Sequence, residues 1–298
     1  MQSRVLFICV CFLVATSMPP AARAQVAATP PWDSVAAILR SPEVQAVGYQ
    51  RFNFPRRDLR LTIGGVAVSP ALALGAWAGF DGDAHLAMMM GDLVLTTAEL
   101  GPVLRELSRQ RIGVTAIHNH LVGETPAITY VHFHAEGDPS DLAHRLNRVL
   151  AWTGTPRPVT PPPAGPLRID AAAVFRALGV TGRAQGDVAQ ASLVFVPGIV
   201  TLHGWTLVPA LAYATPINVE SLDGGRALAS GDFALVARQV GPVLDSLMAH
   251  GIIATALHSH LLGEEPRLYY LHFWADGPLP DVLAGLRAAI DGARRAPS

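Results

Sequence analysis

The same pattern of residues occurs twice in this chain, and the duplication limits the folds that it can adopt. The segment TAIHNHLVGETPAITYVHFHAEG, residues 115–137, returns as TALHSHLLGEEPRLYYLHFWADG at residues 255–277, a constant offset of 140. From Ile117 to Gly137, 11 of the 21 positions are identical in the second copy. A repeated unit of this kind indicates one structural module that packs against its own copy.

The matching continues upstream of these segments. GDLVLTTAELGPVLREL aligns with GDFALVARQVGPVLDSL at the same offset, and VSPALAL matches LVPALAY at an offset of 139. The openings DSVAAILR, from Asp33, and DAAAVFRALG, from Asp170, both predict short helices capped by an aspartate. We predict a first repeat over residues 25–152, a proline-rich linker over 153–167 and a second repeat over 168–298.

Each repeat has the pattern of an α+β fold. Alternating or wholly apolar runs such as LRLTIGGVAV and AHLAMMMGDLVLT predict strands. A helix follows, because apolar residues recur at helical spacing from Leu100 to Leu107, and Thr96 with Glu99 has capping-box spacing. The Gly-Pro pair at 101–102 predicts a kink or the true start of that helix. We expect an opening helix, antiparallel strands, a helix, a histidine-bearing β-hairpin and a closing helix, with the two copies packed as a pseudo-dimer.

Residues 1–24 predict a secretory signal peptide. Arg4 precedes the apolar run VLFICVCFLVA, and Ala22-Arg23-Ala24 offers a small-x-small cleavage site. The run is shorter than the roughly 20 residues that span a bilayer as a helix. Both cysteines, Cys9 and Cys11, lie within this segment, so the mature chain has no disulfide and no sulfur ligand for a metal. We expect a periplasmic or secreted protein with no membrane attachment after cleavage.

Charge narrows the classes of partner. The 22 basic residues are all arginines, and the chain also has 23 acidic residues. The absence of lysine excludes Schiff-base chemistry and a phosphate-loop lysine. The arginines are scattered, so no basic stripe predicts a nucleic-acid partner. The partner that we expect is an unidentified small molecule or a ligand of the cell envelope.

The first copy of the repeated pattern carries two H-x-H pairs. Residues i and i+2 of a strand point to the same face, so His118 shares a face with His120, and His132 with His134. The turn-like GETP lies midway, which predicts an antiparallel pair with His118 opposite His134 and His120 opposite His132. Cβ atoms of opposed residues lie about 4.5–5.5 Å apart, close enough for imidazoles to converge on an ion. We predict that these four histidines bind one divalent metal ion.

Several details of such a site stay open. Without sulfur, histidine and carboxylate ligands suit zinc, which we expect, and also copper, nickel or iron. Glu124 is expected to be a further ligand or the general base of a hydrolase. Other interpretations of the histidines are an anion site, a pH-responsive cluster or a polar cleft wall. The pattern also matches the first half of a cupin metal motif, but the expected glycine is missing and a helix precedes it.

The second copy departs from the first at one histidine. It retains His258, His260 and His272 together with Glu264, whereas Trp274 stands where the first copy has a histidine. We predict a second, degenerate site. The loss reflects drift in one copy, or an open coordination position of a catalytic metal, or a single composite site in which both hairpins face each other across a pseudo-twofold axis. We favour the first copy as the main site.

Two aspartates repeat as well. Asp92 and Asp232 each follow a glycine before an apolar run. We interpret both as turn or strand-end residues rather than as catalytic groups.

The segments GDLVLTTAELGPVL, TAIHNHL, GETP and VHFH, with their repeats, resemble the LppY/LpqO family of exported bacterial proteins. The resemblance covers nearly the whole mature chain. It implies export but no established activity. Founding members of that family are described as lipoproteins, and this chain differs because it lacks the lipid-attachment cysteine.

Two functional classes follow from these observations. The first is a metal-dependent hydrolase of the cell envelope, in which Glu124 acts as a base on a water molecule activated by the ion. The second is a non-catalytic protein that buffers or delivers metal ions, or a metal-stabilised ligand-binding module.

Overall fold

The computed structural model describes residues 32–160 and 169–296. The predicted signal peptide and part of the predicted linker lie outside these residues. The boundaries of the repeats and the linker therefore stay predictions. The first residues of the linker run along the first repeat, because the backbone N–H of Val159 donates to the carbonyl of Arg40 at 2.8 Å.

The first repeat forms a six-stranded antiparallel sheet in the order β1-β2-β5-β6-β9-β7. Its strands are β1 (Glu43–Ala46), β2 (Tyr49–Pro55), β5 (Gly75–Gly82), β6 (Ala87–Thr96), β7 (Gly113–His118) and β9 (Ile128–Gly137). The helices of this repeat that pack with the sheet are α1 (Trp32–Leu39), α3 (Thr97–Arg109) and α4 (Pro139–Leu150).

The second repeat has the same topology, with the order β10-β11-β14-β15-β17-β16. Its strands are β10 (Gly182–Gln185), β11 (Val188–Leu193), β14 (Thr215–Ser221), β15 (Arg226–Leu235), β16 (Ile253–His258) and β17 (Tyr269–Pro278). The corresponding helices are α5 (Ala171–Leu178), α7 (Ala237–Ala249) and α8 (Leu279–Arg295), and the short η1 (Asp223–Gly225) precedes β15.

Small elements connect the main strands. The first repeat adds a three-stranded sheet, β4-β3-β8, and the second adds the pair β12-β13. Their bounds are β3 (Leu61–Ile63), β4 (Val66–Val68), β8 (Glu124–Thr125), β12 (Thr201–Leu202) and β13 (Trp205–Thr206). Two one-turn helices follow, α2 (Pro70–Ala73) and α6 (Pro209–Ala212).

Local signals explain where the helices begin. The Oε2 atom of Glu99 accepts a hydrogen bond from the backbone N–H of Thr96 at 2.8 Å, which confirms the capping box at the start of α3. Asp170 caps α5 by accepting from Ala173 N at 2.9 Å. Asp33 instead lies in the first turn of α1, which begins at Trp32. The Gly-Pro pair does not mark a helix start, because Pro102 lies inside α3.

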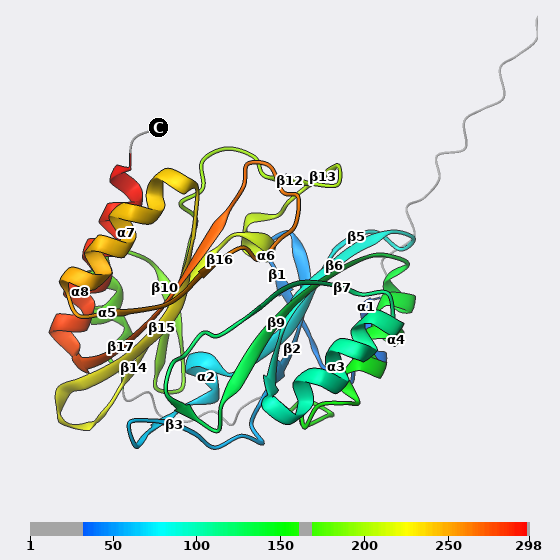
Figure 1. Ribbon diagram of the computed structural model, residues 1–298, viewed down its shortest axis with the longest axis horizontal. Coiled ribbons are helices and arrows are strands. Elements are labelled where there is room, and N and C mark those ends of the chain that lie inside the picture. Colours follow the sequence, from blue (N-terminus) through cyan, green and yellow to red (C-terminus); the bar gives the residue numbers. More distant parts are fainter. Residues whose placement is uncertain (1–31, 161–168, 297–298) are drawn as a thin grey trace, which may run out of the picture.

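The two repeats pack with their sheets toward each other and their long helices outside (Figure 1). Each one-turn helix packs against the sheet of the other repeat. Helix α2 of the first repeat contacts β14 and β15, where Asn218 Nδ2 donates to the carbonyl of Leu72 at 3.2 Å. In return, Leu211 of α6 packs against Gly79 of β5. The contact is so close that a Cβ atom on residue 79 would lie only 2.4 Å from the Cδ1 atom of Leu211. The expected α+β fold with two packed, similar modules is confirmed.

A shared core joins the repeats. Tyr49, Met88 and Met90 of the first repeat cluster with buried residues of the second, which include Val200, Leu202, Leu207, Leu211 and Tyr270. Burial of apolar area at about 25 cal/mol per Å² is the main force that holds such modules together. Apolar packing between the repeats therefore helps to fix the relative position of the two hairpins.

The expected register of the histidine-bearing hairpin is wrong. His118 pairs with Tyr130, and His132 pairs with Ala116. His134 lies opposite Gly113, beyond a bulge between Val114 and Ala116. The loop after β7 is wider than a turn because β8, which contains the GETP glutamate and threonine, pairs with β3 instead of closing the hairpin. Among the residues that the structure describes, no helix is both long and apolar enough to cross a membrane.

Candidate metal centre

Six histidines from the two repeats meet where the sheets face each other. They are His118, His120 and His132 of the first repeat and His258, His260 and His272 of the second. Across the contact, the ring centroids of His118 and His258 lie 3.8 Å apart. The second and third pairs are His120 with His272, at 4.0 Å, and His132 with His260, at 3.7 Å.

These three pairs obey a pseudo-twofold axis. His258 is the repeat counterpart of His118, so the first pair is a residue stacked on its own counterpart. The same twofold rotation converts the His120–His272 pair into the His132–His260 pair, because position 120 corresponds to 260 and position 132 to 272. Such reciprocity is the signature of an isologous contact. The geometry therefore joins both hairpins in one composite cluster, the third of the alternatives left open by the sequence.

An aspartate lies beside two histidines of each repeat. Asp92 lies on β6 directly beside His132 of β9, and its Oδ2 atom is 3.7 Å from His120 Nε2 and 3.8 Å from His132 Nε2. In the second repeat Asp232 takes the same place. Its Oδ2 atom is 3.8 Å from His260 Nε2 and 3.9 Å from His272 Nε2, and these two nitrogens lie 3.3 Å apart.

The carboxylate–imidazole distances are too long for hydrogen bonds, whereas the Nε2 atoms of His260 and His272 lie at hydrogen-bond distance. Two ligands held at 2.0–2.1 Å from a tetrahedral ion lie about 3.3 Å from each other. Within the described part of the chain, buried atoms without a hydrogen-bond partner include His120 Nε2, His132 Nε2, Asp92 Oδ1 and Asp232 Oδ1. Buried polar atoms are almost always paired, so this concentration of unpaired ones has the donor set that a divalent metal ion takes.

Tyrosines hold two of the imidazoles in place. Tyr130 stacks on His120 with ring centroids 3.5 Å apart, and Tyr270 stacks on His260 at 3.6 Å. Each tyrosine is anchored at its far end, because Tyr130 donates to the carbonyl of Ala73 and Tyr270 to that of Ala212. The rings therefore have little freedom to rotate, which favours a preorganised site.

Burial controls the charge of the cluster. It is the largest cause that lowers the pKa of each of the six histidines, and it lowers that of His132 to about 3. Burial raises the pKa of Asp232 to about 8 and that of Asp92 well above its usual value, with nearby Asp232 as the next cause. Neutral imidazole is the form that binds metals, and a bound dication would favour the ionised aspartates.

The predicted general base contacts the loop backbone. Glu124 Oε1 accepts a hydrogen bond from Ile128 N at 3.3 Å, and Glu264 Oε1 accepts one from Leu268 N at 3.0 Å. In the described ranges, neither glutamate belongs to a group of potential ligand atoms within 4.8 Å of one another. The catalytic role of Glu124 therefore stays a prediction.

His134 is not part of the composite cluster. Its ligand atoms group instead with Glu136, also on β9, and with His203 from the turn between β12 and β13. Its counterpart Trp274 is buried and belongs to the hydrophobic cluster around the first sheet. Replacement of the fourth histidine by tryptophan thus leaves the second set of three histidines complete.

Sequence reasoning missed three residues of these groups. The interpretation of Asp92 and Asp232 as turn or strand-end residues is wrong, because they lie within β6 and β15. The Gly-Asp pair recurs at the same offset of 140 as the histidines. A polar residue retained within an apolar strand in both copies was the available signal. His203 has no such signal, because its counterpart in the first repeat is a glycine and the turn lies far from the hairpins in the chain.

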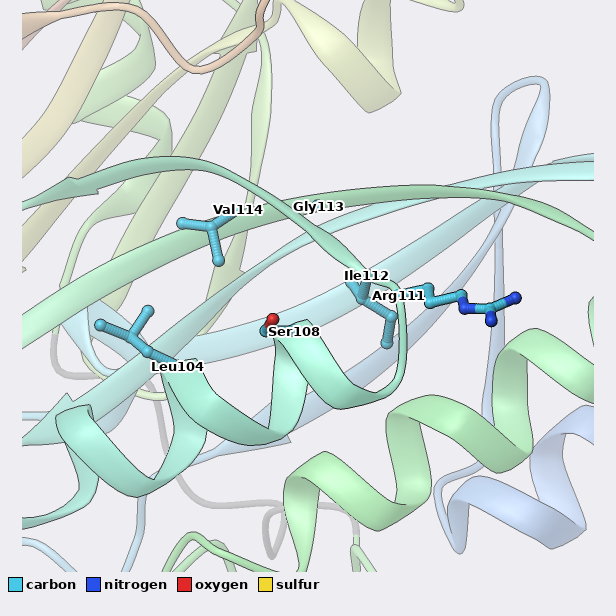
Figure 2. A pocket seen from close by; sticks show the side chains of 6 residues that line it. All are labelled: Leu104, Ser108, Arg111, Ile112, Gly113 and Val114. Atoms are coloured by element: carbon cyan, nitrogen blue, oxygen red, sulfur yellow. The ribbon is translucent and has the colours of Figure 1, made fainter.

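A surface hollow that includes none of the clustered histidines lies between α3 and β7 (Figure 2). It is lined by Leu104, Ser108, Arg111, Ile112, Gly113 and Val114. Its side chains are mostly apolar, and the Arg111 side chain extends away from Leu104 and Val114. The lining lacks the convergent polar groups that a catalytic pocket requires.

Comparison with known families matches both halves of the chain. The model of the Domain of Unknown Function (DUF1259) matches residues 33–152 and again residues 172–292. The chain belongs to the DUF1259 family. Neither the curated proteins nor the solved structures include a match. Two DUF1259 domains in tandem account for the repeat, but the family description names no activity, so function rests on the composite cluster itself.

Proposed function

We propose that this DUF1259 protein binds two divalent transition-metal ions in the composite cluster, one in each set of three histidines and one aspartate. The observation that carries the proposal is the pair of buried aspartates. Each lies within 4 Å of two imidazole nitrogens of its own repeat, in a region rich in unpaired buried polar atoms. Stacking between the repeats brings the two sets together, as in dinuclear sites.

Zinc is the ion that we expect. Three imidazoles and one carboxylate form a closed tetrahedral shell of the kind that zinc prefers, while copper, nickel and iron also accept these ligands. A closed shell supports binding, buffering or delivery of the ion rather than catalysis. The earlier expectation of a single ion changes to two because each repeat supplies its own aspartate.

Metal analysis of matched variants tests the proposal. The mature protein, purified without an affinity tag from metal-replete cells and dialysed, is expected to retain two ions per chain by elemental analysis. Asp92→Asn and Asp232→Asn should each retain one, and the double variant none, whereas Asp141→Asn on the outer helix α4 should match the wild type. A metal-free wild-type protein, or equal content in all variants, would refute the proposal.

A hydrolase is the second candidate function. The observation in its favour is the stacking of the two ligand sets on each other, because two neighbouring metal ions can activate a water molecule for hydrolysis. Glu124, the base predicted from sequence, would first have to release Ile128 N. Hydrolysis of nitrophenyl esters and phosphates by the zinc-loaded protein tests this function, with Glu124→Gln expected to lose activity and keep its metal. No turnover above the rate of zinc in buffer would exclude these substrates.

Export is proposed on the sequence pattern of residues 1–24. The resemblance to the LppY/LpqO family supports export. We also propose that the exported protein meets a small molecule or a ligand of the cell envelope. N-terminal sequencing of the protein from the periplasm or the culture medium is expected to begin at Gln25. Recovery of the uncleaved chain from the cytoplasm would contradict export.

A further inference from the structure

A second group of potential metal ligands lies apart from the composite cluster. His134 Nε2 is 3.5 Å from Glu136 Oε1, and His203 Nδ1 is 3.2 Å from the same oxygen. Potential ligand atoms of all three residues lie within 4.8 Å of one another. His134 and Glu136 come from β9 of the first repeat, whereas His203 comes from the second, so the group forms only when the repeats pack.

The group is more than an exposed ion pair. The His134 side chain is only 12% exposed, and its Nε2 atom is buried without a hydrogen-bond partner in the described structure. Glu136 is 31% exposed and His203 is 55% exposed, so the group opens to solvent on the side of His203. A buried, unpaired nitrogen beside a carboxylate and a second imidazole has the composition of a site that leaves coordination positions open.

The backbone at His203 adds an independent observation. His203 adopts a left-handed conformation with φ of 50°, and its counterpart in the first repeat is Gly64, with φ of 57°. Glycine takes this conformation without steric cost, while other residues adopt it uncommonly, histidine more readily than most. The second repeat therefore places an imidazole at a turn position where the first repeat has a glycine.

Among the residues that the structure describes, the equivalent place on the other side of the pseudo-twofold axis has no such group. Trp274 replaces His134, and it is buried. Asp276 replaces Glu136 and pairs with Arg226, while Gly64 replaces His203. All three positions differ together, so the ligand set exists on one side only.

We propose that His134, Glu136 and His203 form a separate site for a divalent transition-metal ion, more exposed and weaker than the composite cluster. The site goes beyond the proposed function, because it shares no residue with the six clustered histidines and their aspartates. Two imidazoles and one carboxylate hold the ion, and solvent or a small ligand reaches it from the side of His203.

Cobalt(II) titration of the metal-free mature protein, followed by visible absorption and calorimetry, tests this site. The wild type is expected to take up one weak ion after the composite cluster is filled. His203→Gly, which places the counterpart residue in the same turn, should lose that ion and keep the tight ones. Glu136→Gln should weaken it at least about tenfold, because loss of a group that merely orients a metal ligand already costs about that much. His144→Ala on α4 serves as the control and should match the wild type.

The outcomes separate this site from the composite cluster. If the cluster binds no metal, the wild type still takes up one ion that His203→Gly loses, and the proposal stands. If His203→Gly and Glu136→Gln both titrate like the wild type, the proposal is overturned. Thermal melting of each variant shows whether it is folded, and a destabilised His203→Gly leaves Glu136→Gln to decide.

Discussion

The two repeats are nearly the same at their contact and different at its margin. At the contact, each supplies three histidines, one aspartate and one stacking tyrosine. At the margin, the first repeat has His134 and Glu136 where the second has Trp274 and Asp276. The difference shows that residues on or near the pseudo-twofold axis serve both halves at once, whereas residues farther from it are free to diverge.

A second difference lies at the start of α3 and α7. In the first repeat the buried Arg56 donates to Glu99, at 2.7 Å, and to Asp58, at 2.8 Å. In the second repeat Gln239 replaces Glu99, and its amide donates to the carbonyls of Phe195 and Ala293, both at 3.0 Å. One helix start is thus held by buried charges and the other by neutral hydrogen bonds.

The largest expected effect comes from the residues at the axis. The double variant His118→Ala with His258→Ala should lose both tightly bound ions, because it removes one imidazole from each set of ligands. The double variant His85→Ala with His144→Ala removes two exposed histidines and should keep both ions. Elemental analysis after dialysis measures the result. Retention of two ions by the first variant would show that the stacked pair is not a ligand pair.

The next largest effect is the loss of stability when the start of α3 or of α7 is changed. Glu99→Ala leaves Arg56 buried with one carboxylate partner fewer, and we expect a loss of about 3–5 kcal/mol of unfolding free energy. Gln239→Ala removes only neutral hydrogen bonds and should cost about 1–3 kcal/mol. Urea denaturation of both variants checks the order. Equal losses would mean that the buried charge contributes nothing special to the first repeat.

A smaller effect is expected from pH on the metal-free protein. The buried histidines have folded pKa values below the unfolded value of about 6.5, so the unfolded chain binds more protons as the pH falls from there toward about 3. Acid in this window therefore favours unfolding. The aspartates act oppositely, because their raised pKa values remove stability as the pH rises from about 4 to about 8.

The six histidines outnumber the two aspartates, so the steeper loss is expected on the acid side. Denaturant unfolding at pH 4.5, 6.5 and 8 in the presence of a chelator measures it. The double variant His132→Gln with His272→Gln should flatten the acid side. An unfolding midpoint that stays constant between pH 6.5 and 4.5 would contradict burial of neutral histidines.

The smallest effect on metal content is expected at the margin of the second repeat. Trp274→His adds an imidazole at the position of His134, but it creates neither Glu136 nor His203 on that side. The number of tight ions should stay at two, and stability should fall because a buried tryptophan is lost. Elemental analysis and thermal melting measure both quantities. A gain of one tight ion would place position 274 in the composite cluster.

Much of the fold follows from local patterns. The i, i+2 spacing places His118 toward the cluster, and the capping box places the start of α3. The hairpin register does not follow, because the GETP segment looks like a tight turn, while pairing of β8 with β3 widens the loop. The position of Asp92 beside His132 could not be predicted from local patterns, because β6 and β9 become neighbours only in the folded sheet.

The stacking of His118 on its own counterpart has a consequence for the history of the chain. Each repeat carries both halves of the reciprocal contact, so one repeat on its own could build the same cluster as a homodimer. Fusion of two copies makes that assembly independent of protein concentration. It also lifts a restriction, because every substitution in a homodimer appears twice. The histidine at position 203 and the glycine at its counterpart position 64 form an asymmetric pair that a homodimer of identical repeats could not carry.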